Sequence, residues 1–308
     1  MRRLLALVTV VVLLVVVGVA GGCSGDDDDD GSGVAEAPEV EDFVYQLQGY
    51  ADDGVDELVA AQQDLAVIDL ARDGHDDWFT AEEIAELQGS GKTVLAYFSI
   101  GTIEDFRTER AGLPDDLVLN VWPDWPEEHW VRYWEPAWWD TVVRPRVDQA
   151  LAAGFDGVYL DTPLAYENID LALVEGEDRE SLAQKMVDLV VRISDHGKEQ
   201  DPGFLVFPQN SPELRTYPGY VDAVDGLGIE ELFFAADDDT SDKPCVQSWC
   251  GENLAHVEAL RDAGKQILAV DYASDPDNVA TACDRYADEG FAGYVTTRAL
   301  DTISPACP

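Results

Sequence analysis

From residue 43 onward, short apolar runs alternate with amphipathic stretches, and this alternation limits the choice of fold more than any other feature of the chain. Such a pattern is typical of βα units, which build a parallel sheet. Helix boundary signals accompany the amphipathic stretches: Thr80 and Glu83 suit a capping box at one start, and Gly154 and Gly264 follow two ends. The predicted strands are Val44–Gly49, Leu65–Leu70, Thr93–Ile100, Gly157–Asp161, Phe204–Pro208, Ala223–Ile229, Gln266–Asp271 and Gly293–Thr297. The clearest predicted helices are Thr80–Gln88, Trp138–Ala152, Ser181–Ser194, Glu252–Ala263 and Asp277–Glu289.

The number of these repeats favours a closed α/β barrel. Eight strands that alternate with helices complete a (β/α)8 TIM barrel, and the chain has neither a GxGxxG loop nor a P-loop. We therefore predict a single (β/α)8 barrel domain over residues 43–308. The Pro- and Trp-rich segment 101–135 is predicted to be a long loop of the active site.

The N-terminal residues indicate export. Met1-Arg2-Arg3 precedes an apolar run that reaches Ala20, which is typical of a signal peptide over residues 1–22. Small residues before Cys23 resemble a bacterial lipobox, so we expect Cys23 to become a lipidated N-terminus that anchors the protein to the membrane at the cell surface. A plain N-terminal membrane anchor with an incidental cysteine is the alternative. Residues 23–42, with their run of five Asp, are predicted to form a flexible acidic tether.

The charge balance is strongly acidic, with 63 Asp and Glu against 19 Lys and Arg and a formal net charge of -44. Nucleic acid is excluded as a partner, because its phosphates would be repelled. The acidic residues are spread along the whole chain, and the 46% of hydrophobic residues argues against disorder. We therefore predict a folded, halophilic protein that works in very high salt, where screening suppresses self-repulsion.

Four cysteines remain after Cys23, and an even number in an exported protein indicates disulfides. Three pairings are possible. We favour Cys245 with Cys250, closing a local loop, and Cys283 with Cys307, fixing the C-terminus. A zinc site is the alternative, although the spacing matches no zinc pattern.

Acidic residues recur at the carboxyl ends of the predicted strands, where (β/α)8 barrels hold their catalytic groups. A ring of carboxyls without a His or Cys cluster predicts no metal and no cofactor, and it suits acid–base chemistry on a glycosidic bond. Asp161 directly follows the apolar run Val158-Tyr159-Leu160 and is the strongest catalytic candidate. Structural or substrate-positioning roles are preferred for Asp69 and Asp271.

Aromatic residues gather between the third and fourth predicted strands. Their flat faces could stack on sugar rings or fill the core. Trp125 and Trp134 are equally compatible with both roles, and Trp134 is included among the predicted substrate-binding residues.

The motifs in these segments resemble the endo-α-1,4-polygalactosaminidase family of glycoside hydrolases, family 114. The most specific are Gly154-Phe155-Asp156-Gly157-Val158-Tyr159-Leu160-Asp161, and Gln209-Asn210 followed by Glu230-Glu231-Leu232-Phe233. The resemblance implies a (β/α)8 barrel that hydrolyses an α-linked amino-sugar polymer, with Asp161 and Glu230 as the catalytic pair. It also implies a sugar site lined by Asp69, Tyr97, Glu104, Arg107, Asn210 and Asp271.

Two hypotheses of different classes follow. The first is an extracellular, lipid-anchored, monomeric glycoside hydrolase whose partner is an amino-sugar polysaccharide. The alternative is a catalytically silent surface lipoprotein that binds polysaccharide. A transglycosidase, in which a sugar replaces water as the acceptor, is a third reading.

Overall fold

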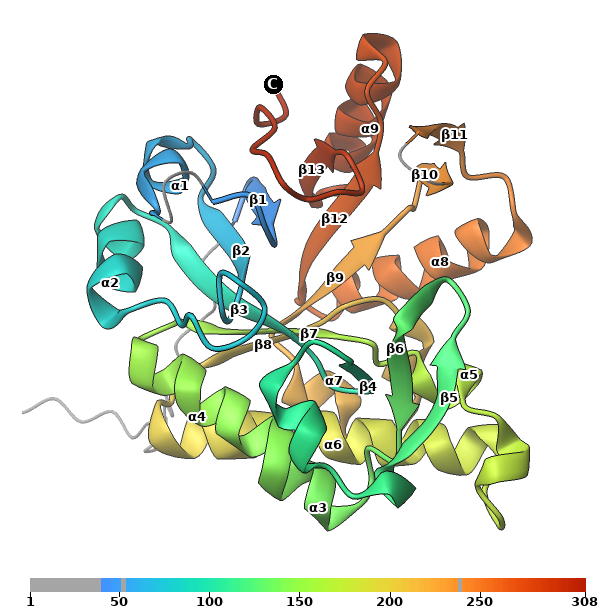
Figure 1. Cartoon of the computed structure of the whole chain (residues 1–308). Helices are drawn as coiled ribbons and strands as arrows, with labels where there is room; N and C mark the ends of the chain where they lie inside the picture. The colour runs from blue at the N-terminus through green and yellow to red at the C-terminus, as the bar shows by residue number, and fades with distance from the viewer. Residues whose placement is uncertain (1–39, 51–53, 238–239) are drawn as a thin grey trace, which may run out of the picture. The chain divides into compact units, whose positions relative to one another are not determined.

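The computed structural model describes residues 40–50, 54–237 and 240–308, and within them the predicted strands form a (β/α)8 barrel (Figure 1). All eight barrel strands pair in parallel with their neighbours. The sixth predicted strand begins at Gly226, later than expected, because Tyr220–Ala223 form the short helix α7. The barrel strands are β1 (Phe43–Gln46), β2 (Leu65–Asp69), β3 (Thr93–Ser99), β7 (Gly157–Asp161), β8 (Leu205–Pro208), β9 (Gly226–Glu230), β12 (Gln266–Tyr272) and β13 (Ala292–Thr296).

The barrel closes from two sheets. Strands β1-β2-β3-β7-β8 form a five-stranded sheet, and β13-β12-β9 form a three-stranded sheet. Single parallel bridges join the two sheets at both edges, Asp42 with Gly293 and Gln209 with Gly228. Every residue of β1, β2, β8 and β13 is buried, as expected for parallel strands that are covered by helices.

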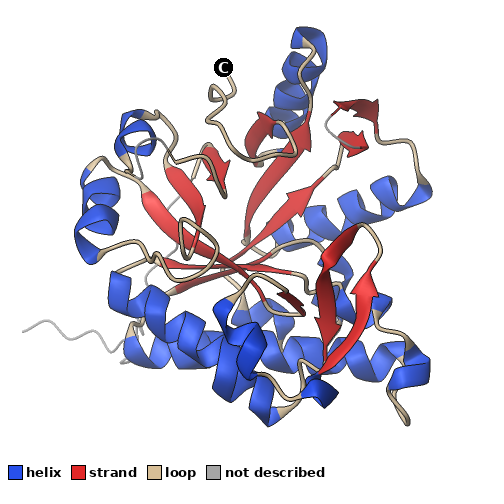
Figure 2. Cartoon of the chain, in the orientation of Figure 1, coloured by secondary structure: helices blue, strands red, loops and turns tan. Residues whose placement is uncertain are grey.

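Helices surround the strands (Figure 2). The five predicted helices are present as α2 (Ala81–Gly89), α4 (Arg144–Ala153), α6 (Arg179–Gln200), α8 (Ser248–Asp262) and α9 (Pro276–Glu289). The Thr80–Glu83 capping box is confirmed, and a second one, formed by Asp178 and Ser181, starts α6 earlier than predicted. Short helices occur at α1 (Asp56–Ala60), α3 (Pro136–Trp138) and α5 (Ala165–Asn168), and a π-helical turn covers Trp139–Val143. Within the described ranges, no helix has the length and apolar character that a membrane crossing requires.

The segment 101–135 is more ordered than the predicted loop. It contains an antiparallel sheet of order β4-β6-β5, built from β4 (Thr102–Glu104), β5 (Val118–Trp122) and β6 (Trp125–Val131). Valine and tryptophan favour strands here, and the two-residue turn after Trp122 closes the β5–β6 hairpin. This insertion brings polar side chains from β4 and β6 to the ends of β3 and β7.

The described chain starts at Val40, whose amide and carbonyl both bond the Gln266 side chain. Residues 1–39, which hold the predicted signal peptide, Cys23 and most of the predicted tether, lie outside the described residues. The three residues 40–42 of that tether are described, and Asp42 pairs with β13.

Both favoured disulfides are confirmed. Cys245 is bonded to Cys250, and Cys283 is bonded to Cys307, so these four sulfurs do not form a zinc site. The first disulfide joins the short β10–β11 hairpin, β10 (Phe234–Asp237) and β11 (Thr240–Pro244), to the start of α8. The second ties the C-terminal segment to α9.

Candidate active site

Asp161 and Glu230 are the last residues of β7 and β9, and both reach the carboxyl end of the barrel. Only β8 lies between these two strands. Their side chains influence one another, because the negative charge of Glu230 acts on Asp161. The structure therefore brings together the two carboxyls that the sequence predicted as a pair.

Asp161 is held from two sides. The Thr162 amide donates to its Oδ1 at 2.6 Å, and the Tyr97 hydroxyl donates to its Oδ2. Burial, followed by the negative charge of Glu230, raises the pKa of Asp161 from its usual value near 3.8 to about 7. Near neutral pH this carboxyl can therefore hold a proton.

Glu230 is surrounded by hydrogen-bond donors. The Asn210 amide donates to Oε2 at 2.9 Å, Gln209 donates to the same oxygen, and the Tyr272 hydroxyl donates to Oε1. Asn210 also accepts from the Glu230 backbone amide at 3.0 Å. Beneath this shell, the Tyr45 hydroxyl donates to Gln209 at 3.0 Å. Predicted Asn210 thus positions a catalytic candidate, and the carboxylate has little freedom to rotate.

Residues with left-handed backbone follow strands β7, β8 and β9. Thr162 after β7, Asn210 after β8 and Glu231 after β9 have φ angles of 63°, 64° and 58°. Non-glycine residues in this region are uncommon and cost free energy, and they concentrate at functional sites. The turns at Thr162 and Glu231 end β7 and β9 directly after Asp161 and Glu230.

Arg107 forms ion pairs with two carboxyls, that of Asp69 at the end of β2 and that of Glu104 at the end of β4. Arg107 donates to both oxygens of Asp69, at 3.2 and 2.9 Å, and its Nε donates to Glu104 Oε1 at 3.1 Å. Burial raises the pKa of Asp69 even though Arg107 acts in the opposite direction. These three predicted residues do lie together, but Asp69 is buried and engaged with Arg107, so it positions that guanidinium.

Glu128 on β6 is a site residue that the sequence reasoning missed. It is the register partner of Glu104 on β4, and it accepts a hydrogen bond from the Thr102 hydroxyl at 2.5 Å. Burial, then the charges of Glu104 and Asp161, raise the pKa of Glu128 to about 8. No signal in the sequence marked Glu128, since its strand lay in a segment predicted as a loop.

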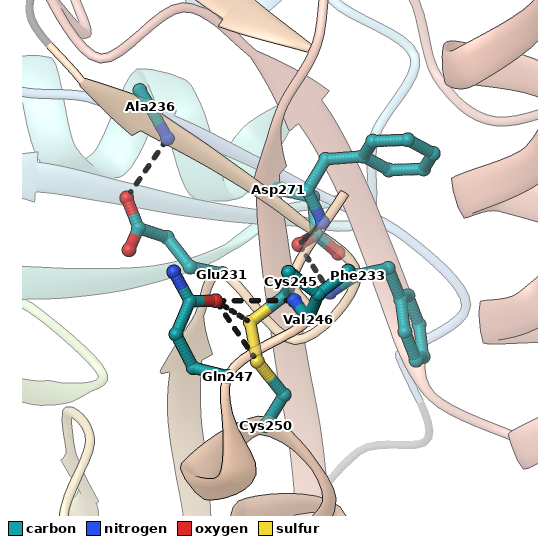
Figure 3. Close-up of a disulfide and its surroundings, with 9 residues drawn as sticks. Glu231, Phe233, Ala236, Cys245, Val246, Gln247, Cys250 and Asp271 are labelled. Carbon is teal, nitrogen blue, oxygen red and sulfur yellow. Dashed lines mark hydrogen bonds between the residues drawn. A yellow bond between two sulfur atoms is a disulfide. The ribbon is translucent and has the colours of Figure 1, made fainter. Parts of the chain in front are cut away.

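Asp271 does not reach the site. It has no exposed surface, and its oxygens accept from the amides of Phe233 and Phe234, both at 2.8 Å, and from the Tyr286 hydroxyl at 2.6 Å. Figure 3 shows Asp271 beside the Cys245–Cys250 disulfide and the segment that follows Glu231. The predicted sugar-lining role is therefore replaced by a structural one, holding the loop after β9.

The two tryptophans that the sequence left open differ in position. Trp134 packs edge-on against Tyr133, and its ring faces Lys185 of the outer helix α6. This placement favours packing over the predicted substrate contact. Trp125, at the start of β6, is 46% exposed and lies 5.0 Å from the Arg298 guanidinium, beyond the end of β13.

Within the residues that the structure describes, no group of three or more His, Cys, Asp or Glu side chains is placed to hold a metal ion.

The chain matches a known protein family, and it is similar in fold to solved glycoside hydrolases. A model of glycoside-hydrolase family GH114 matches residues 29–308. An uncharacterized protein of Deinococcus radiodurans is 33% identical over 269 residues, covering 86% of this chain and 82% of its own. In fold, the chain is similar to the glycoside hydrolase domain of PelA from Pseudomonas aeruginosa, with 20% identity, a TM-score of 0.66, and coverage of 85% of this chain and 97% of that one. It is also similar to Aspergillus fumigatus Ega3, solved in complex with galactosamine, with 17% identity, a TM-score of 0.64, and coverage of 87% and 96%.

Proposed function

The chain belongs to glycoside-hydrolase family GH114, and from that membership we propose that it cleaves an α-linked amino-sugar polysaccharide, in the manner of an endo-α-1,4-polygalactosaminidase, through Asp161 and Glu230. Glycoside hydrolysis needs one carboxyl to protonate the leaving oxygen and a second to attack the anomeric carbon or to activate water. The observation that carries the proposal is the burial of Asp161 beside Glu230, which raises the Asp161 pKa to about 7. A buried acid with a raised pKa can supply the proton that the leaving oxygen needs.

The charges around the pair support an amino-sugar substrate. Three further carboxyls lie near the pair, those of Glu104, Glu128 and Asp69. Among the residues that the structure describes, Arg107 is the cation that binds this group. Such a site favours a positively charged ligand over a neutral or anionic one. A partly deacetylated amino-sugar polymer carries that charge, and galactosamine is the sugar bound by the similar Ega3.

The test is to replace each carboxyl by its amide. We expect Asp161→Asn and Glu230→Gln each to lower kcat on partly deacetylated galactosaminan by roughly a thousandfold or more, since general acid–base and nucleophilic roles are worth this much. Glu127→Gln is the matched control, an exposed carboxyl on β6 next to the site. Release of reducing ends measures the rate in high salt. Unchanged activity in both amide variants would show that this pair is not the catalytic one, and an inactive wild type would favour the silent binding protein.

The cellular location is proposed from the sequence. Cys23 as a lipidated N-terminus would attach the barrel to the outside of the cell, and the two disulfides suit an oxidising compartment. Incorporation of labelled palmitate should disappear in Cys23→Ser. A Cys23→Ser variant that still incorporates the palmitate label would contradict the proposed lipid anchor.

A further inference from the structure

Tyr159 on β7 has a buried hydroxyl that makes no hydrogen bond within the described part of the chain. The residue has no exposed surface. A Phe would fill almost the same volume without an unsatisfied polar atom, and a buried hydroxyl without a partner destabilises a folded protein. The free protein therefore gains no stability from this hydroxyl, and its role has to be sought in the reacting enzyme.

The Tyr159 hydroxyl lies between the two strands that end in the catalytic candidates. Tyr159 precedes Asp161 by two residues on β7. Its hydroxyl meets β9 at Gly228, which precedes Glu230 by two residues. A Cβ at Gly228 would lie 1.9 Å from the hydroxyl oxygen, so the ring can cross to β9 only because position 228 has no side chain. Residues two apart on a strand share a face, so the hydroxyl lies one layer deeper in the barrel than the pair.

Both carboxyls of the pair act on this hydroxyl. Burial, followed by the charges of Glu230 and Asp161, raises the pKa of Tyr159 well above its usual value near 10. The oxygen therefore keeps its proton near neutral pH and is a hydrogen-bond donor. In the described contacts, Glu230 Oε1 and both oxygens of Asp161 accept one hydrogen bond each. A carboxylate oxygen can accept two, so each carboxyl has room for a further donor.

Glycoside hydrolysis moves a negative charge from one carboxyl to the other. The carboxyl that acts as the acid gives its proton to the leaving oxygen as the glycosidic C–O bond breaks, and it becomes a carboxylate. The other carboxylate loses its charge, either by forming a bond to the anomeric carbon or by taking a proton from the attacking water. The pair thus carries one negative charge before and after this step, but at opposite strand ends.

We propose that Tyr159 is a positioning residue whose hydroxyl donates to whichever of Asp161 and Glu230 carries the negative charge during hydrolysis. This inference rests on the proposed function and deepens it, because it names a group that stabilises the charge as it moves between the two strands. A hydroxyl hydrogen can turn about its C–O bond, so one oxygen beneath the pair can donate first to one carboxyl and then to the other. Hydrogen bonds to ionised groups are strong, and those of catalytic groups often form fully only in the reacting complex.

The experiment compares Tyr159→Phe with the wild type in high salt, by thermal unfolding and by release of reducing ends from partly deacetylated galactosaminan. We expect Tm to rise by about 2–4 °C, because an unsatisfied hydroxyl is removed. We expect kcat to fall roughly tenfold or more, since a hydrogen bond to a charged group is worth this much. KM should stay unchanged, because Tyr159 has no exposed surface with which to touch the sugar. A variant that is more stable and yet slower distinguishes this role from a structural one.

Tyr220→Phe is the matched control. Tyr220 on α7 also has a buried hydroxyl without a hydrogen-bond partner among the residues that the structure describes. The charge that acts on it is that of Glu213, and neither carboxyl of the catalytic pair contributes. We expect Tyr220→Phe to show a similar rise in Tm and to keep the kcat of the wild type.

Three results would overturn the role of Tyr159. The first is a Tyr159→Phe variant with the kcat of the wild type, and the second is a lower Tm, which would mean that the hydroxyl has a partner in the free protein. The third is an equal loss of kcat in Tyr220→Phe, because the effect would then not depend on the place of the hydroxyl. Cleavage by the wild type at the rate of Tyr159→Phe refutes this role alone, whereas a wild type that cleaves no amino-sugar polymer refutes the proposed function and this inference with it.

Discussion

Burial and the charge of Glu230 raise the pKa of Asp161 to about 7, although the two residues stand on strands separated by β8. A carboxyl perturbed this far, at the mouth of a barrel, is where acid–base chemistry is expected. The contacts around the pair give each residue a defined set of donors, and these donors can be removed one at a time.

Tyr272→Phe removes the hydroxyl that donates to Glu230 Oε1. We expect kcat to fall roughly tenfold with little change in KM, and the pH profile to shift, since one hydrogen bond to a carboxylate is worth about 1.5–3 kcal/mol. Tyr133→Phe removes a buried hydroxyl that donates to Leu182 on α6, and it should leave the profile unchanged. Equal effects of the two variants on the pH profile would mean that Tyr272 acts only through stability.

The stability of the fold should decrease as pH rises from 5 to 8.5. Burial is the first cause that raises the pKa of Asp271 to about 6, of Asp161 to about 7 and of Glu128 to about 8. A raised acid pKa means that the folded state binds the proton more tightly. The stabilisation that each acid gives is complete below its pKa in the unfolded chain, near 4. It is lost as the pH rises through the pKa of that acid in the folded protein. Each group contributes at most about 1.4 kcal/mol per pH unit.

Urea unfolding at constant salt measures this dependence. Glu128→Gln should make the decrease shallower over the whole range from pH 5 to 8, and it should leave the curve nearly level above pH 7, where Asp271 and Asp161 no longer contribute. A free energy of unfolding that stays level or rises from pH 5 to 8.5 would contradict the assignment of these buried acids.

Gly228→Ala should damage the barrel below the active site. Gly228 lies within β9, and a Cβ added there would lie 1.9 Å from the buried Tyr159 hydroxyl. We expect a loss of about 1–3 kcal/mol from overpacking, with reduced activity as Glu230 two residues later is displaced. Gly89→Ala at the end of α2, where a Cβ meets nothing within 4 Å, should be neutral or stabilising. Thermal unfolding compares the two, and equal Tm values would contradict the predicted clash.

The two disulfides should contribute unequally. Cys283 and Cys307 are 24 residues apart, whereas Cys245 and Cys250 are 5 apart. Chain-entropy arguments predict that the double serine variant of the longer loop loses about 3.5 kcal/mol and that of the shorter loop about 2 kcal/mol. Urea midpoints of both variants test the order. The reverse order would indicate that strain or native contacts outweigh loop entropy.

The barrel, and the places of Asp161 and Glu230 at the ends of two of its strands, were predictable because their signals are local. Each barrel strand is a short apolar run, and Asp161 and Glu230 end two of these runs. The β5–β6 hairpin was missed because β6 begins Trp125-Pro126-Glu127-Glu128, without the apolar alternation of a strand. Glu128 was hidden with it.

Asp271 shows why a strand end alone does not identify a site residue. Side chains alternate between the two faces of a strand, so neighbours point in opposite directions. Asp271 faces Tyr286 of the outer helix α9, and Tyr272, the next residue, reaches Glu230. Deciding between the two faces takes the register of β12 with its neighbours, which the sequence of one strand does not contain.

The edge at which β8 meets β9, here called the seam, links closure of the barrel to the spacing of Asp161 and Glu230. Asp161 belongs to the five-stranded sheet and Glu230 to the three-stranded one, and a single bridge at Gln209 and Gly228 joins these edges. The Gln209 side chain also binds Glu230. The spacing between these two carboxyls therefore depends on how the two sheets pair at this seam, and a shift at the seam would change the distance between Asp161 and Glu230. Substitutions distant from the sugar would in this way change the rate of hydrolysis without replacing Asp161 or Glu230.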